Sequence, residues 1–191
     1  MIVSAPDYVG PLEGWRAWHV VERDGALRLV SPLYRTAWPA REAFAAACRR
    51  GLEQGVSLYH PRTRHTAPAW GCGCGIYGSF GPAHAAAYMS RFFKHREDVV
   101  HRVIGTVSLW GEVVECESGW RASRAYPRRI YVPRPEGRRF FFRGLRRPAL
   151  PAAEIALALA DYGVSVQLVA CSSVDELAEI ASRPDLGQEA A

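Results

Sequence analysis

Residues 99–132, VVHRVIGTVSLWGEVVECESGWRASRAYPRRIYV, are the stretch that decides the fold. Apolar and polar residues alternate around Val107 and Leu109, and again around Val114, as in strands with one buried face. Gly111 falls where this alternation changes phase, which predicts a bulge or a tight bend. We therefore expect a run of paired strands in this part of the chain.

Further strands and helices are expected before this stretch. The Asp24-Gly25 pair between residues 15–21 and 26–33 predicts a hairpin. Residues 39–51 begin with proline, carry apolar side chains at helical spacing and end in glycine, which predicts a helix. Residues 83–94 predict a second helix.

The character of the chain changes after Pro148. Apolar side chains at helical spacing end at Gly163, and an apolar strand over 164–170 follows. Ser173-Val-Asp-Glu176 then has the pattern of a capping box, which opens another helix. The sequence thus predicts a C-terminal helix, strand and helix.

These elements indicate an α+β fold, with an antiparallel sheet or small β-barrel built from the hairpin and the strands of 99–143. We expect one β-rich core domain over residues 1–148 and a C-terminal extension of the same domain over 149–183. Residues 184–191 are polar, and we expect a frayed tail there.

Composition narrows the class of protein. The chain has 191 residues, of which 49% are hydrophobic, so it can bury a core without disulfides. Its first ten residues lack the pattern of a secretory signal, and its longest apolar run is too short to span a bilayer. We therefore expect a soluble cytoplasmic protein with no membrane partner. In that compartment, clustered thiols are more often metal ligands or redox groups than disulfides.

The chain places two of its five cysteines in Trp70-Gly-Cys-Gly-Cys-Gly75, within a loop at 55–81 that is rich in Gly, Pro and His. Long loops without periodicity usually have a function or need a ligand to order them. Cys72 and Cys74 are too close in sequence to form a disulfide with each other. A positive φ at the intervening Gly73 would let both sulfurs turn toward one ion.

Zinc requires four ligands in a tetrahedron, usually cysteine and histidine. The best further candidates are Cys48, which precedes the loop, and His65 within it, with His60 as a substitute for His65. The sequence therefore predicts a structural zinc site of three cysteines and one histidine that organises the loop. Two alternatives stay open, namely inert thiols and a redox or nucleophilic cysteine. The ligand set is Cys48, His65, Cys72 and Cys74.

Several motifs together resemble a group of bacterial hypothetical proteins. They are Gly14-Trp-Arg-Ala-Trp18, Cys72-x-Cys-Gly-Ile-Tyr77, Leu109-Trp-Gly-x-Val-x-Glu115 and Gly119-Trp-Arg-Ala-x-x-Ala-Tyr-Pro127. The resemblance covers roughly residues 14–132. It implies no activity, cofactor or binding residue, so the zinc prediction rests on ligand chemistry alone.

Positive charge is concentrated in one segment. Residues 121–147 contain ten arginines and one acid, a net charge of 10 − 1 = +9, so the rest of the chain carries 5 − 9 = −4. Arginines interleaved with aromatics suit phosphates and stacked bases, although arginines on the wet face of a sheet would look the same. The candidate nucleic-acid-binding residues are Trp120, Arg121, Arg124, Tyr126, Arg128, Arg129, Arg138 and Arg139.

Catalytic motifs are not evident. The chain has no nucleophile elbow, phosphate-binding loop or His-Glu-x-x-His helix. We therefore expect a zinc-containing protein that binds nucleic acid or an acidic protein partner, or acts as an adaptor, without catalytic activity of its own. The alternative is a small enzyme that uses the Cys/His loop as a metal-activated or thiol-based site.

Overall fold

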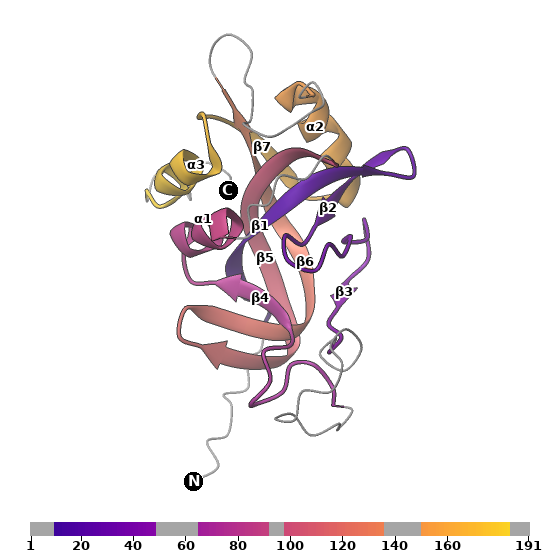
Figure 1. Ribbon diagram of the computed structural model, residues 1–191, viewed down its shortest axis with the longest axis vertical. Coiled ribbons are helices and arrows are strands. Elements are labelled where there is room, and N and C mark those ends of the chain that lie inside the picture. Colours follow the sequence, from indigo (N-terminus) through magenta and orange to yellow (C-terminus); the bar gives the residue numbers. More distant parts are fainter. Residues whose placement is uncertain (1–9, 49–64, 92–97, 136–149, 184–191) are drawn as a thin grey trace.

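The computed structural model describes residues 10–48, 65–91, 98–135 and 150–183. Its largest feature is a hairpin of two long antiparallel strands, β5 (Val99–Cys116) and β6 (Gly119–Arg134) (Figure 1). The pairing shifts register between Trp110 and Val113, and Gly111 there has a φ of 78°. The strands and the irregularity predicted from the alternation are both confirmed.

The expected N-terminal hairpin is also present. Strand β1 (Leu12–Arg23) pairs with β2 (Ala26–Val30) across a turn in which Asp24 and Gly25 both have positive φ. Such a turn has the twist that connects two antiparallel strands. Along most of its length β1 also pairs with β5, so the two hairpins share one sheet.

A short strand, β4 (Ile76–Ser79), closes part of the sheet into a ring. It pairs with β1 through Ser79 and Trp15, and with β6 along its whole length. Hydrogen-bonded pairings thus run from β1 to β5, to β6, to β4 and back to β1. The backbones approach so closely that a Cβ on Gly119 would lie 2.1 Å from the Gly78 carbonyl oxygen.

The prediction of a helix over residues 39–51 is wrong for residues 39–48, which the structure describes. Phe44–Ala45 instead form strand β3, which pairs with β6, and the backbone N–H of Ala46 bonds to a β6 carbonyl. Trp38, fully buried, stacks on Phe44 with ring centroids 4.9 Å apart. Packing against the sheet therefore overrides the local helical spacing. Residues 49–51 lie outside the described part.

Two helices cover one side of the sheet. Helices α1 (Pro82–Arg91) and α3 (Val174–Ala181) lie next to each other there (Figure 1). Buried side chains of both helices pack with residues of β1, β5 and β6 in one apolar cluster. The second predicted helix is thus confirmed over its described residues.

The larger core lies on the other face of these strands, beneath α2 (Ala152–Leu159). A 3₁₀ turn over Ala160–Tyr162 extends α2 and ends at Gly163, whose φ is 68°. The buried Tyr162 hydroxyl accepts a hydrogen bond from the Leu29 N–H (2.9 Å) and donates one to the Trp38 carbonyl (2.8 Å). This residue therefore ties the C-terminal segment to the N-terminal one.

The rest of the C-terminal prediction is confirmed. Strand β7 (Ser165–Ala170) adds to β6 in parallel, which makes the seven-stranded sheet mixed but mostly antiparallel. The Ser173 hydroxyl accepts a hydrogen bond from the Glu176 N–H and caps α3, as the capping box predicted. Residues 136–143, where the expected run of strands continues, and the tail from 184 lie outside the described residues. Within the described segments, no helix has the length and apolarity needed to cross a bilayer.

Candidate metal centre

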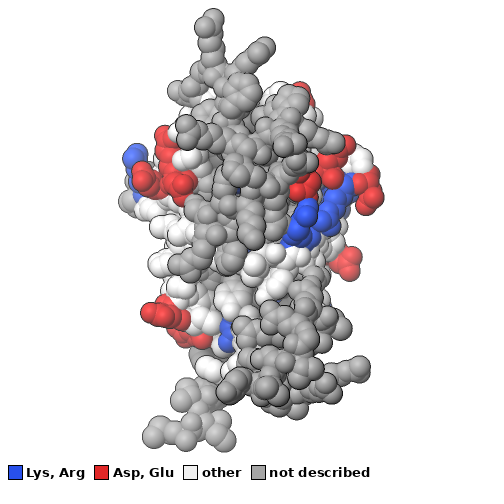
Figure 2. Space-filling view, in the orientation of Figure 1, with Lys and Arg blue, Asp and Glu red and all other residues white. Residues whose placement is uncertain are grey.

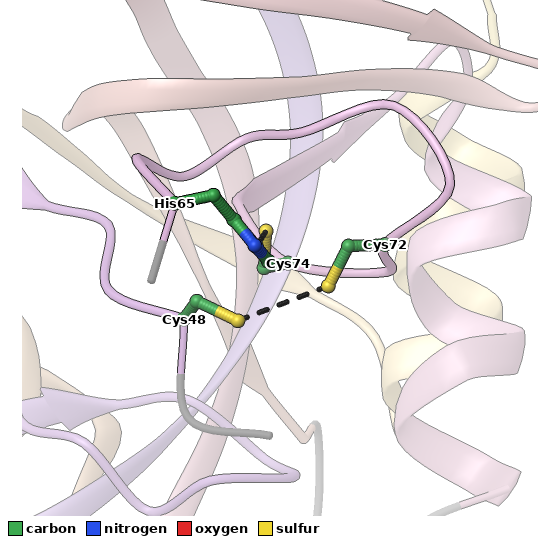
Figure 3. A group of neighbouring side chains, drawn as sticks. All are labelled: Cys48, His65, Cys72 and Cys74. Carbon is green, nitrogen blue, oxygen red and sulfur yellow. Dashed lines mark hydrogen bonds between the residues drawn. The ribbon is translucent and has the colours of Figure 1, made fainter. Parts of the chain in front are cut away.

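Four side chains from two separate segments gather at one end of the sheet. They are the sulfurs of Cys48, Cys72 and Cys74 and a ring nitrogen of His65, and these four atoms all lie within 4.8 Å of one another (Figure 3). The three cysteines are partly exposed, and His65 is exposed. The group could hold a metal ion, and its members are the four residues selected from the sequence. The substitute His60 lies outside the described residues.

Two of the distances between donor atoms are close to those of tetrahedral zinc coordination. With Zn–S bonds of about 2.3 Å, two sulfurs of a tetrahedron lie about 3.8 Å apart, and a sulfur and a nitrogen lie slightly closer. The Cys48 and Cys72 sulfurs are 3.8 Å apart, and His65 Nε2 is 3.3 Å from the Cys74 sulfur. These two distances are therefore close to those between ligands of one tetrahedral zinc ion.

The cysteine loop turns at Gly71 and Gly75, the glycines before Cys72 and after Cys74. Gly71 has a φ of 75° and Gly75 a φ of 118°. Gly73, between the two cysteines, is not among the residues with positive φ, so the turn predicted there occurs on either side of it instead. Residues 76–79 of the predicted irregular loop instead form β4, and its residues 55–64 lie outside the described part.

Arg121 holds the loop against the sheet. Its side chain extends from β6 and packs under the loop, and only 7% of the residue is exposed. Nη1 donates hydrogen bonds to the carbonyl oxygens of Cys72 and Cys74 (2.8 Å to Cys74), with a longer contact of 3.4 Å to the Ala69 carbonyl. Nε donates to the Cys116 sulfur at 3.2 Å. One guanidinium therefore fixes the backbone of both neighbouring candidate ligands.

The two thiols of the motif differ in acidity. Burial raises the pKa of Cys72, but hydrogen bonds from the Cys74 backbone and from the side chains of Cys74, Cys48 and His65 outweigh it and lower this pKa to about 7. Burial raises the pKa of Cys74 to about 11, and the neighbouring thiols add to the rise. Of these two thiols Cys72 therefore ionises first, and a bound cation would favour the thiolate form of its cysteine ligands.

The described arginines of the basic segment do not all lie on one exposed surface. Arg124 and Arg128 are exposed, and Arg128 pairs with Glu13 at 3.3 Å. Arg121 lies under the metal loop, and Arg129 donates a hydrogen bond to the Tyr131 hydroxyl at 3.3 Å. The remaining basic candidates, Arg138 and Arg139, lie outside the described residues.

The aromatic candidates contact the protein itself. Trp120 is half-buried and meets Phe80 edge to face, with ring centroids 4.6 Å apart. The Tyr126 hydroxyl donates a hydrogen bond to the Tyr162 carbonyl (2.7 Å) and accepts one from the Arg41 N–H (2.6 Å). On the face shown in Figure 2, described basic side chains lie beside acidic ones, without a broad area of one sign among the described residues.

Comparison of the chain with protein-family models, curated proteins and solved structures finds no match. Sequence reasoning selected the four candidate ligands but missed the contact of Arg121 with their loop. Alternation along β6 places Arg121 on the opposite face from Trp120, which was the available signal. The contact of Arg121 with the cysteine loop became evident only from the structure, in which Tyr77 of β4 pairs with Arg121 of β6.

Proposed function

We propose that this chain is a zinc-containing binding protein, in which zinc is structural. The observation that supports this most strongly is the convergence of three sulfurs and one imidazole nitrogen within 4.8 Å. Soft sulfur and borderline nitrogen donors in this number favour zinc over oxygen-seeking metals such as magnesium and calcium. Zinc bound here would join Cys48, which follows β3, to the loop that leads into β4.

The number of ligands separates a structural site from a catalytic one. Structural zinc takes four protein ligands, whereas catalytic zinc takes three and leaves a fourth position for water or substrate. Four candidate ligands are available, and none of them has to come from outside the chain. The arrangement therefore favours a closed site without catalytic activity of its own over the alternative of a metal-activated or thiol-based enzyme.

Elemental analysis after exhaustive dialysis tests this proposal. We expect about one zinc per chain, as for other structural sites with four protein ligands. Cys72→Ser and Cys74→Ser should abolish stoichiometric zinc, while Cys171→Ala, at a buried thiol outside the group, should retain it. Protein that folds fully without any metal would refute the proposal.

For the partner we propose nucleic acid, on the basis of the +9 segment in a chain whose remainder is acidic. Arg124 and Arg134 are exposed on β6 and available for phosphate contacts, and Arg128 would first have to leave its ion pair with Glu13. Fluorescence anisotropy against single-stranded and duplex DNA and RNA at rising salt tests this. Each lost phosphate contact should lower the slope of log affinity against log salt by about one.

The matched pair for this test is Arg124→Ala against Arg23→Ala, an exposed arginine on β1 outside the basic segment. Only the first should weaken binding and lower the slope. If no nucleic acid binds at low salt, the partner is an acidic protein or the arginines only solvate the sheet. In that case the zinc proposal still stands, because it rests on different residues.

A further inference from the structure

Arg121 is a buried cation without an acidic partner among the described residues. The ion pairs found there involve Arg28, Arg35 and Arg128, and none involves Arg121. Burying a charge is costly unless an opposite charge or several hydrogen bonds compensate it. Arg121 Nε and Nη1 donate to one thiol and to carbonyl oxygens, which accept hydrogen bonds but carry no charge to balance the guanidinium.

The metal centre supplies a charge of the right sign. Zinc carries +2 and three cysteine thiolates carry −3, so a Cys₃His zinc site has a net charge of 2 − 3 = −1, equal and opposite to that of one guanidinium. Arg121 is bonded to the backbone of two of the three cysteines, Cys72 and Cys74. The guanidinium is therefore held against the loop that carries two of the three thiolates.

We propose that Arg121 is the counter-charge of the metal centre, so that a divalent ion bound by three thiolates is the species that this site stabilises. This inference rests on the proposed zinc function. It adds that the protein favours the zinc complex in which all three cysteines are thiolates. It also reassigns Arg121 from the nucleic-acid surface to the metal centre. Arg121 acts here as a positioning residue, because no metal–ligand bond involves it.

The surroundings of Arg121 support a specific role at this place. The guanidinium carbon of Arg121 lies over the Tyr77 ring, 5.9 Å from the ring centroid. The ring and the cysteine loop therefore both border the guanidinium. Because a guanidinium is not deprotonated in proteins, Arg121 carries its charge whenever the site is formed.

Two variants separate charge from hydrogen bonding. Arg121→Gln keeps N–H donors for the loop carbonyls but removes the charge, while Arg121→Lys keeps the charge and loses the planar fork. Zinc affinity is measured on the full chain by competition with a chromophoric chelator. We expect Arg121→Gln to lose about 10- to 100-fold, as is typical for residues that support metal ligands, and Arg121→Lys to lose clearly less.

A change in the charge of the site gives the decisive comparison. Cys48→His converts the site to two thiolates and two imidazoles, whose zinc complex is neutral at 2 − 2 = 0. If Arg121 acts through its charge, Arg121→Gln should cost much less zinc affinity in the Cys48→His background than in the native one. Equal losses in the two backgrounds would show that Arg121 only holds the backbone, and would overturn the inference.

Spectra of the cobalt-substituted protein provide a second readout. Without the nearby cation the thiolates donate electrons more readily, so the sulfur-to-cobalt charge-transfer band should move to longer wavelength in Arg121→Gln. Arg23→Met, which removes the charge of an exposed arginine on β1, should leave zinc affinity and spectrum unchanged.

The outcomes separate the two proposals. If the unmodified protein binds no zinc, the proposed function fails and the inference fails with it. If it binds zinc and Arg121→Gln binds equally well, only the inference is wrong. Should Arg121→Gln not fold, as judged by thermal unfolding with zinc present, Arg121→Met provides a second neutral variant for the same comparisons with Arg121→Lys.

Discussion

Replacing Gly75 by alanine should weaken metal binding through the backbone of the loop. Gly75 follows Cys74, has a φ of 118°, and connects the cysteine motif to β4. A Cβ at this position would lie 3.0 Å from the Cβ of Arg121 and 3.0 Å from the Cβ of Pro68. Carbon atoms normally approach to about 3.5–4.0 Å, so alanine is both strained and crowded here.

The size of the effect follows from the backbone conformation. A non-glycine residue in such a region of φ costs about 1–3 kcal/mol, and the two close contacts add to this. If the cost falls on the metal-binding conformation of the loop, zinc affinity should fall by about 5- to 150-fold. Competition with a chromophoric chelator on the full-length Gly75→Ala protein measures this loss.

Two further glycines provide matched controls in the same segment. Gly71 also has a positive φ, but a Cβ there meets no atom within 4 Å, so Gly71→Ala should show the conformational cost without the crowding. Gly81 has neither feature, so Gly81→Ala should bind zinc like the unmodified protein. If Gly75→Ala binds zinc as tightly as Gly81→Ala, the loop does not need this conformation to bind metal.

Two other predictions concern stability. Tyr162→Phe leaves the buried Leu29 N–H and Trp38 carbonyl without their partner and should lower the free energy of unfolding by about 2–4 kcal/mol in urea titrations, whereas Tyr34→Phe, at an exposed tyrosine, should be neutral. Hydrogen bonds from the Ser172 hydroxyl and N–H lower the pKa of Glu176. These bonds therefore stabilise the fold at neutral pH, and this contribution is lost as the pH falls through the pKa of Glu176 in the folded protein. Glu176→Gln should therefore show a smaller loss of stability on acidification, and an unchanged acid dependence would count against this role.

The strands could be predicted from the sequence because their signals are local. Alternation around Val107 and Leu109 reflects which side chains face the core, and the Asp24-Gly25 turn fixes its own backbone geometry. The helix at 39–51 failed for the opposite reason. Helical spacing is a local preference, but burial of Trp38 and pairing of Phe44 with β6 are long-range interactions that no local pattern reveals.

The candidate ligands could be selected because cysteine and histidine are few and their chemistry is specific. What could not be predicted was how the loop is supported. Arg121 looked like one of ten similar arginines, and its position under Cys72 and Cys74 depends on β4 pairing with β6. For the same reason, a net charge counted along the segment could not show that its described arginines point in different directions.

X-ray absorption at the zinc edge of the purified full-length protein tests the central claim most directly. A structural Cys₃His site predicts three sulfur neighbours at about 2.3 Å and one nitrogen neighbour at about 2.0–2.1 Å, with no water in the coordination sphere. His65→Ala should remove the nitrogen neighbour, while His84→Ala, at an exposed histidine of α1, should leave the spectrum unchanged. A sample without zinc, or one with oxygen neighbours in place of the sulfurs, would contradict the account.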